Sequence, residues 1–69
     1  MKTVDARGLF CPEPVMLTQK AIASGESEYE ILVDNRTCVE NVSRFAAARG
    51  FHAETVEKED GYAIMLKKQ

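Results

Sequence analysis

The only two prolines of this chain stand at positions 12 and 14, and they restrict the fold near its N-terminus. Proline is favoured at the first position of a helix, where its missing N–H would have no partner and its fixed φ is already helical. We therefore expect a helix over Pro12–Ala23, with Cys11 as its N-cap and Pro14 in its third position. The cysteine would stand where an extended loop changes into a helix.

The residues that follow support an amphipathic helix. Gly25 is placed to end it in a left-handed conformation. Phe10 before the helix and Val15 inside its first turn are spaced for a hydrophobic staple, which would fix the entry angle of the chain. Apolar or small residues recur at helical spacing at Pro14, Leu17, Thr18, Ala21 and Ile22.

A second helix is expected after position 36. Thr37 and Glu40 fit a capping box, with Thr37 as N-cap, Glu40 three positions later and Cys38 at the first helical position. Gly50 is placed to end this helix. Its apolar stripe consists of Val39, Val42, Phe45 and Ala46.

The remaining segments have strand-like patterns, and they complete the order βαβαββ. We expect strands over Lys2–Asp5, Tyr29–Val33, Phe51–Glu57 and Tyr62–Lys67, with Asp-Gly as the signal for a hairpin between the last two. Tandem strand–helix units favour right-handed crossovers. The predicted fold is therefore an α/β two-layer sandwich, with a mixed four-stranded sheet and both helices on one face. No linker or repeat interrupts residues 1–69, which predicts a single domain.

Composition narrows the functional classes. The chain has 69 residues, of which 45% are apolar and 29% charged, as in ordinary globular domains. Its two cysteines are too few for a secreted disulfide scaffold, and its N-terminus has no signal-peptide pattern, so we expect a cytoplasmic protein without a membrane span. A net charge of −2 without a basic block argues against direct binding of nucleic acid.

Cys11 is the candidate reactive residue. A helix N-terminus favours an anion by roughly 0.3–1 kcal/mol, so the pKa of this thiol should fall by up to about one unit from about 8.5. Glu13 in the first turn opposes a second negative charge, and Arg7 could offset it if the loop folds back. The alternative is that Cys11 is only a structural cap.

The pattern Asp5-x-Arg7-Gly8-Leu9-x-Cys11-Pro12-x-Pro14-Val15 resembles the signature of the TusA/SirA/YedF family of small sulfur-carrier proteins. The second half, from Val33-Asp34-Asn35 to Arg49-Gly50-Phe51, resembles the YedF branch, which is associated with selenium metabolism. Some members of that branch have a further domain downstream, so this chain fits both a complete protein and an N-terminal piece.

The resemblance implies a fold like that of the C-terminal domain of bacterial translation initiation factor three. It also implies a function: the cysteine at position 11 accepts persulfide sulfur, or selenium, from a cysteine desulfurase or rhodanese-like donor. An acceptor protein then receives the cargo. Such sulfurtransferase-like carriage requires no cofactor and no metal. The rival hypothesis is a non-catalytic binding or regulatory module that docks a partner on the same surface.

Other residues carry two interpretations each. Asp5, Arg7 and Gly8 match the family pattern and could orient the cysteine loop, or could simply form a turn. Pro12, Glu13 and Pro14 complete the motif around the thiol. Met16 lies off the apolar stripe and is either part of an exposed docking patch or a lone exposed methionine. Asp34 and Asn35 could shape the surface beside Cys11, or could belong to an ordinary turn before a helix.

Cys38 and His52 complete the set of candidates. Cys38 is either a packing residue or a second thiol that resolves a persulfide, and a permanent disulfide with Cys11 is disfavoured by the spacing of adjacent helices. A zinc site is disfavoured, because only two cysteines and one histidine are available and they are spread over the whole chain. His52 is instead expected to be exposed or to lie at the rim.

Overall fold

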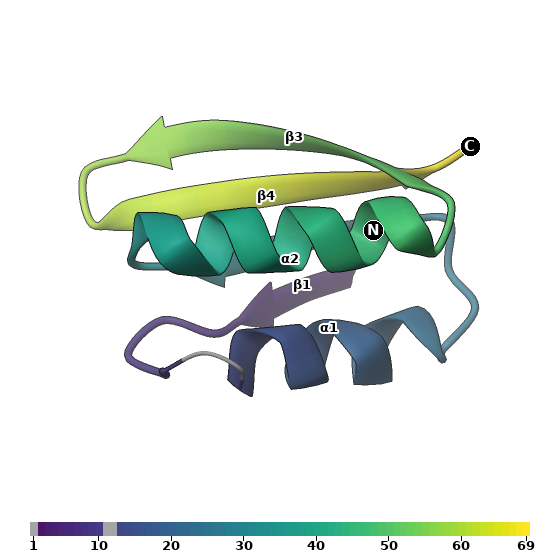
Figure 1. Cartoon of the computed structure of the whole chain (residues 1–69), viewed down its shortest axis with the longest axis horizontal. Helices are drawn as coiled ribbons and strands as arrows, with labels where there is room; N and C mark the ends of the chain where they lie inside the picture. The colour runs from purple at the N-terminus through teal and green to yellow at the C-terminus, as the bar shows by residue number, and fades with distance from the viewer. Residues whose placement is uncertain (1, 11–12) are drawn as a thin grey trace.

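The computed structural model describes residues 2–10 and 13–69, so the predicted N-cap role of Cys11 and the first-turn role of Pro12 lie outside the described residues. Its elements follow the order βαβαββ (Figure 1). They are β1 (Lys2–Asp5), α1 (Glu13–Ile22), β2 (Glu28–Val33), α2 (Arg36–Ala48), β3 (Phe51–Lys58) and β4 (Gly61–Lys68).

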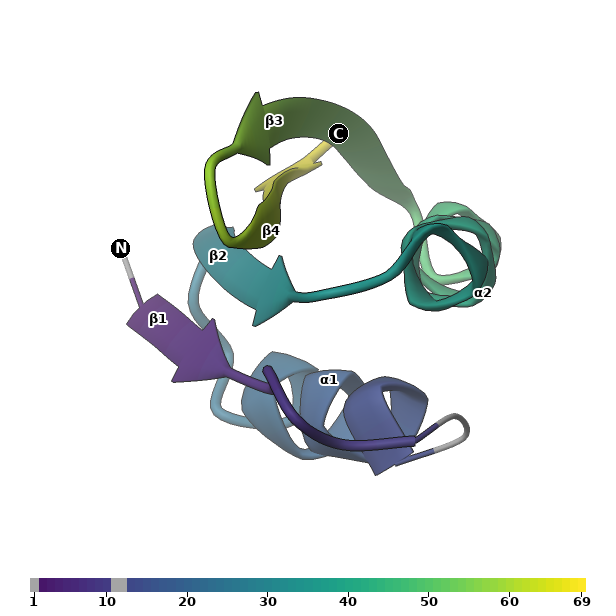
Figure 2. The ribbon, with the colours of Figure 1, turned by 90° about the vertical axis from the view of Figure 1, so that its left-hand side faces the viewer.

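The four strands form one mixed sheet in the order β1-β2-β4-β3. β1 pairs in parallel with β2, and β4 pairs antiparallel with both β2 and β3. Both helices cover the same face of this sheet, as the view along the strands shows (Figure 2). The predicted two-layer α/β sandwich is confirmed.

The core fills the space between the sheet and the helices. Alternate residues of β2 and β4 point into it, as the period of two along a strand requires. The ring of Tyr29 packs edge-on against Phe51, with centroids 5.8 Å apart, and its hydroxyl accepts a hydrogen bond from the Glu26 amide at 2.9 Å. The fully buried side chains of this layer include Tyr29, Ile31, Val33, Ile64, Leu66 and Val42.

Helix α1 begins and ends within a residue of its predicted bounds. Thr18 is fully buried, and its hydroxyl donates to the Pro14 carbonyl at 2.8 Å, which satisfies it inside the core. The predicted hydrophobic staple is wrong, because Phe10 is 82% exposed. The Phe10 carbonyl instead accepts a hydrogen bond from the Glu13 amide at 2.8 Å, and the Phe10 ring lies in solvent.

The predicted capping box of α2 is also wrong. Asn35 is the N-cap, and its side-chain oxygen accepts from the Cys38 amide at 2.9 Å. The helix therefore begins at Arg36, and Cys38 occupies the third position instead of the first. Asparagine caps at least as well as threonine, and the earlier start gives α2 two helical residues, Arg36 and Thr37, before its buried stretch begins at Cys38.

The core predicts a clear difference between two β-branched residues of neighbouring strands. Ile64→Ala removes a fully buried side chain from β4 and should lower the free energy of unfolding by about 2–5 kcal/mol. Val56→Ala removes a half-exposed side chain from β3 and should cost less than about 1 kcal/mol. Urea unfolding of both variants measures the difference, and equal costs would contradict the assigned core.

The cap of α2 can be tested in the same way. Asn35→Ala removes the acceptor of the Cys38 amide and should cost about 1 kcal/mol of stability, whereas Thr37→Ala, inside the helix, should cost a few tenths at most. A larger loss for Thr37→Ala would restore the capping box that the structure rejects.

Candidate functional site

Three connections meet at one end of the sheet. They are the loop between β1 and α1, the short turn between β2 and α2, and the β3–β4 hairpin turn (Figures 1 and 2). The parallel pairing of β1 with β2 brings the first two together, because the carboxyl ends of parallel strands lie at the same edge. We call residues 6–10 the cysteine loop, since they precede Cys11 in the sequence.

Arg7 ties the start of the cysteine loop to the hairpin turn. Its Nε and Nη2 donate to the two carboxylate oxygens of Asp5, both at 2.9 Å, and its Nη1 donates to Asp60 at 2.5 Å. The Arg7 hydrogen bonds hold the pKa of Asp5 at about 2, and the Asp5 carboxylate raises the pKa of Arg7. The guanidinium expected to offset Glu13 is thus shared between two carboxylates.

Gly61 makes the approach of the hairpin turn possible. A Cβ at this position would collide with the Val33 carbonyl oxygen and would lie 2.9 Å from the Asp34 Cα. The hairpin is therefore confirmed where Asp-Gly predicted it, and Gly61 additionally lets that turn lie directly against the end of β2. This contact explains how Asp60 reaches Arg7, 53 residues away in the sequence.

Gly8 is held by a second carboxylate. Its amide donates to Asp34 Oδ2 at 2.6 Å, and its φ of +80° is a left-handed conformation that favours glycine. Two residues before Gly8, the Ala6 amide donates to the Leu32 carbonyl at 2.8 Å, and the Ala6 side chain is buried. The cysteine loop is therefore attached to β2 and to the turn after it.

Asp34 also connects this loop to α2. Its Oδ1 accepts from the Asn35 side-chain amide at 3.3 Å, and the Asn35 oxygen faces the Cys38 amide. Asp34 and Asn35 are more than turn formers, since together they link Gly8 to the first turn of α2. These contacts go beyond the ordinary turn before a helix that was one of the two interpretations of these residues.

Among the predicted site residues that the structure describes, Pro14 and Cys38 are buried. Pro14 lies fully inside the first turn of α1, and Cys38 is 1% exposed among Val39 and Val42. Burial favours the packing interpretation of Cys38. Cys11 and Pro12 lie outside the described residues, and the described residues on either side of them are joined by the Phe10–Glu13 hydrogen bond.

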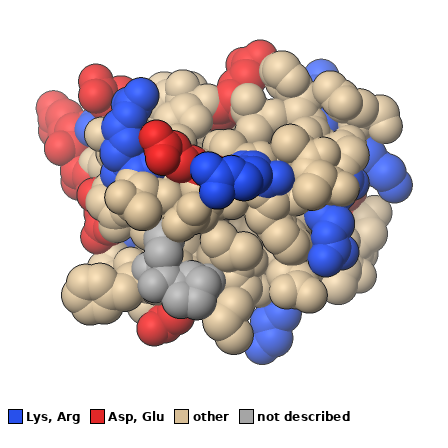
Figure 3. All heavy atoms as spheres, viewed as in Figure 1, with Lys and Arg blue, Asp and Glu red and all other residues tan. Residues whose placement is uncertain are grey.

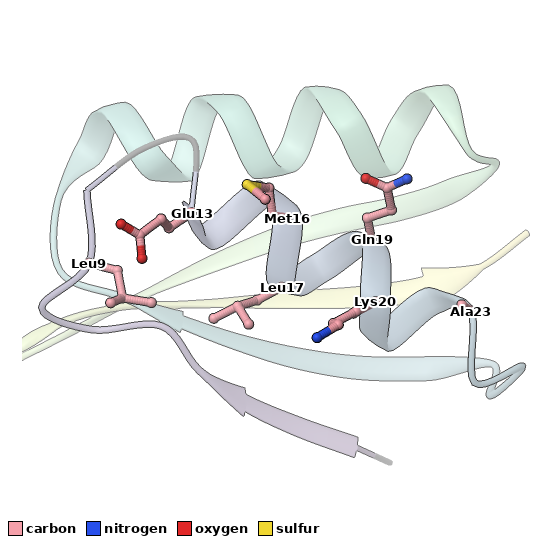
Figure 4. Close-up of a pocket in the computed structure, with 7 residues that line it drawn as sticks. All are labelled: Leu9, Glu13, Met16, Leu17, Gln19, Lys20 and Ala23. Atoms are coloured by element: carbon pink, nitrogen blue, oxygen red, sulfur yellow. The ribbon is translucent and has the colours of Figure 1, made fainter.

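A shallow groove runs along the outer side of α1 (Figure 4). The volume of this groove is about 520 Å³. Met16, which is one of its lining residues, is 60% exposed, as its position off the apolar stripe predicted. Glu13 stands at one end and Lys20 towards the other. No pattern in the sequence indicated that Leu9 of the cysteine loop also lines this groove. The lining residues are Leu9, Glu13, Met16, Leu17, Gln19, Lys20 and Ala23.

Acidic side chains gather around the β3–β4 turn, at the left of Figure 3. Asp34, Glu57, Glu59 and Asp60 line a second hollow there, of about 310 Å³. In residues 2–10 and 13–69, no group of three or more histidine, cysteine, aspartate or glutamate side chains could hold a metal ion. His52 is exposed beside Glu54, with its Nε2 3.2 Å from a carboxylate oxygen. None of the helices in the described part of the chain is long and apolar enough to span a membrane.

Comparison with known proteins gives a consistent result. Residues 2–68 match the family model described as sulfurtransferase TusA. A candidate sulfur carrier protein of Methanocaldococcus jannaschii is 38% identical over 72 aligned positions, covering 99% of this chain and 95% of the relative. A second candidate sulfur carrier, from Archaeoglobus fulgidus, is 33% identical over 72 positions, covering 99% and 97%.

The fold has a solved counterpart. The crystal structure of a SirA-like protein from Desulfitobacterium hafniense superimposes with a TM-score of 0.84 at 34% sequence identity, and the match covers 100% of both chains. The predicted resemblance to this family is therefore confirmed over nearly the whole sequence.

The Asp5–Arg7 pair predicts a pH dependence of stability. The pKa of Asp5 lies at about 2 in the folded chain, below its ordinary value of 3.8, so its stabilising effect is complete above about pH 4 and is lost as the pH falls through 2. Asp5→Asn should therefore be less stable than wild type at pH 7, and the difference should shrink between pH 4 and pH 2. Thermal melts across this range would contradict the pairing if the difference were constant.

Proposed function

Because this chain belongs to the TusA sulfurtransferase family, we propose that it is a sulfur carrier that accepts a sulfane sulfur on Cys11 and delivers it to a partner protein. The observation that carries the proposal is the family match over residues 2–68, which includes the Cys-Pro-x-Pro motif. Within the described residues, the surroundings of that motif are compatible with the chemistry.

Loading is a thiol exchange. The Cys11 thiolate attacks the terminal sulfur of a persulfide on the donor, a new S–S bond forms on Cys11, and the S–S bond of the donor breaks to release its cysteine thiolate. The transferred sulfur keeps its proton, and no external oxidant or reductant is needed. Delivery repeats the exchange, with an acceptor thiolate as the attacking group and Cys11 as the leaving group.

Three features of the described residues support this role. The Glu13 amide donates to the Phe10 carbonyl, and α1 begins at Glu13, two positions after the cysteine in the sequence; the N-terminus of a helix favours an anion. Buried Pro14 fixes the first turn against the core. Phe10 and Met16 are large apolar side chains in solvent, near the groove of α1, which suits docking of a donor or acceptor.

The donor class that fits is a cysteine desulfurase or a rhodanese-like protein, since each can present sulfane sulfur to an incoming thiolate. Selenium can follow the same exchange in place of sulfur. A cytoplasmic location follows from the need to keep Cys11 reduced. Direct contact with nucleic acid is not part of the proposal, because the net charge is −2.

The proposal predicts a specific gain of mass. After incubation with a cysteine desulfurase and cysteine, intact wild-type protein should gain one sulfur atom, and peptide mapping should place it on Cys11. Cys11→Ser should gain none, whereas Cys38→Ala, checked for folding by circular dichroism, should still be loaded. Equal loading of Cys11→Ser, or no gain on wild type with desulfurase and rhodanese-like donors alike, would leave the docking-module alternative in its place.

A further inference from the structure

We propose that Asp34 and Asp60 are positioning residues, which hold the cysteine loop in the conformation that presents Cys11 to partner proteins. The inference rests on the sulfur-carrier function proposed above. Neither carboxylate lies in the Asp5–Val15 motif around Cys11. Both act from other connections of the chain, the β2–α2 turn and the β3–β4 turn.

Asp34 makes a short hydrogen bond to the main chain of the cysteine loop. Its Oδ2 lies 2.6 Å from the amide nitrogen of Gly8, three residues before Cys11. Hydrogen bonds to a charged acceptor are stronger than those between neutral groups. The other oxygen of the same carboxylate engages Asn35, which caps α2, so the position of Asp34 is itself fixed by a helix that packs on the core.

Asp60 binds Arg7, the residue before Gly8. The Asp60 carboxylate accepts a hydrogen bond from Arg7 Nη1, and the Asp5 carboxylate accepts from Nε and Nη2, so the guanidinium is held from two sides. All three side chains are about half exposed, and exposed ion pairs are individually weak. The geometry nevertheless fixes the Arg7 side chain at the point where the chain leaves β1.

At the bend of the loop, carboxylate oxygens accept hydrogen bonds from two consecutive backbone amides, those of Arg7 and Gly8. The Arg7 amide donates to Asp5 Oδ1 at 3.1 Å, and the Gly8 amide donates to Asp34. The main chain supplies the bond before the bend, from Ala6 to Leu32, and the bond after it, from Glu13 to Phe10. The conformation of the bend therefore depends on side chains that can be removed one at a time.

Position is important for an exchange between two proteins. The reacting sulfurs must come within roughly 3–3.5 Å in line, and a misplacement of about 1 Å can cost a large factor in rate. A carrier whose cysteine follows a flexible bend would rarely meet that condition. The two aspartates supply order to this bend without contacting the cargo.

The first test compares Asp34→Ala with Asp34→Asn. Both variants lose the charge, but only asparagine keeps an acceptor oxygen for Gly8, so their difference isolates the hydrogen bond. Amide exchange of Gly8 should be about tenfold faster in Asp34→Ala than in Asp34→Asn, and the Cys11 amide resonance should shift further from wild type. The maximal rate of sulfur loading by the desulfurase should be about tenfold lower in the alanine variant.

The second test compares Asp60→Ala with Glu59→Ala, a matched change of charge in the same turn. Asp60→Ala should slow loading about two- to fivefold, as expected for an exposed pair, and Glu59→Ala should leave the rate unchanged. Combined with Arg7→Ala, the Asp60→Ala change should add little, because the pair acts as a unit. All rates are measured well below the melting temperature of each variant.

The outcomes separate the two proposals. If wild type takes up no sulfur, the carrier function fails, and the positioning role is then decided by the Gly8 exchange and the Cys11 resonance alone. Equal Gly8 exchange in Asp34→Ala and Asp34→Asn would overturn the positioning role. Faster Gly8 exchange with equal loading of the two variants would overturn it as well, because the loop would then move without consequence for transfer.

Discussion

The parallel pairing of β1 with β2 is the constraint on which the site depends. It places the end of β1 beside the end of β2, so that Gly8 of one connection meets Asp34 of the next. The antiparallel β4 strand then brings the hairpin turn to the same end, because Val33 pairs with Tyr62 directly after Gly61. Three distant parts of a small chain thus surround one loop. A different strand order would leave that loop without its carboxylate partners.

This arrangement divides the work between a rigid support and an exposed surface. The support consists of the buried first turn of α1, anchored by Pro14 and Thr18, and of the carboxylates around Arg7 and Gly8. The exposed surface consists of Phe10, Met16 and the groove along α1. A sulfur carrier needs both, since it must meet at least two different proteins and yet offer the same atom to each.

Sequence patterns predicted the elements, the fold and the motif, because they depend on local rules: proline at a helix start, period-two burial in strands, and Asp-Gly at a hairpin. The errors concern interactions that local rules cannot rank. Asn35 and Thr37 are both good caps, and the buried position of Cys38 decided between them. Phe10 has the sequence spacing of a hydrophobic staple, but its carbonyl accepts a hydrogen bond from the Glu13 amide and its ring lies in solvent. The contact of Arg7 with Asp60 spans 53 residues and has no signal in a single sequence.

The proposed function requires Cys11 to be a nucleophile, with its thiolate favoured by the N-terminus of α1. The most direct measurement is the pH dependence of Cys11 alkylation in the folded wild-type protein, followed by peptide mapping. We expect a midpoint of the alkylation rate about one unit below the value of about 8.5 for an ordinary cysteine. A midpoint at or above about 8.5, or a thiol that reacts only after unfolding, would contradict it.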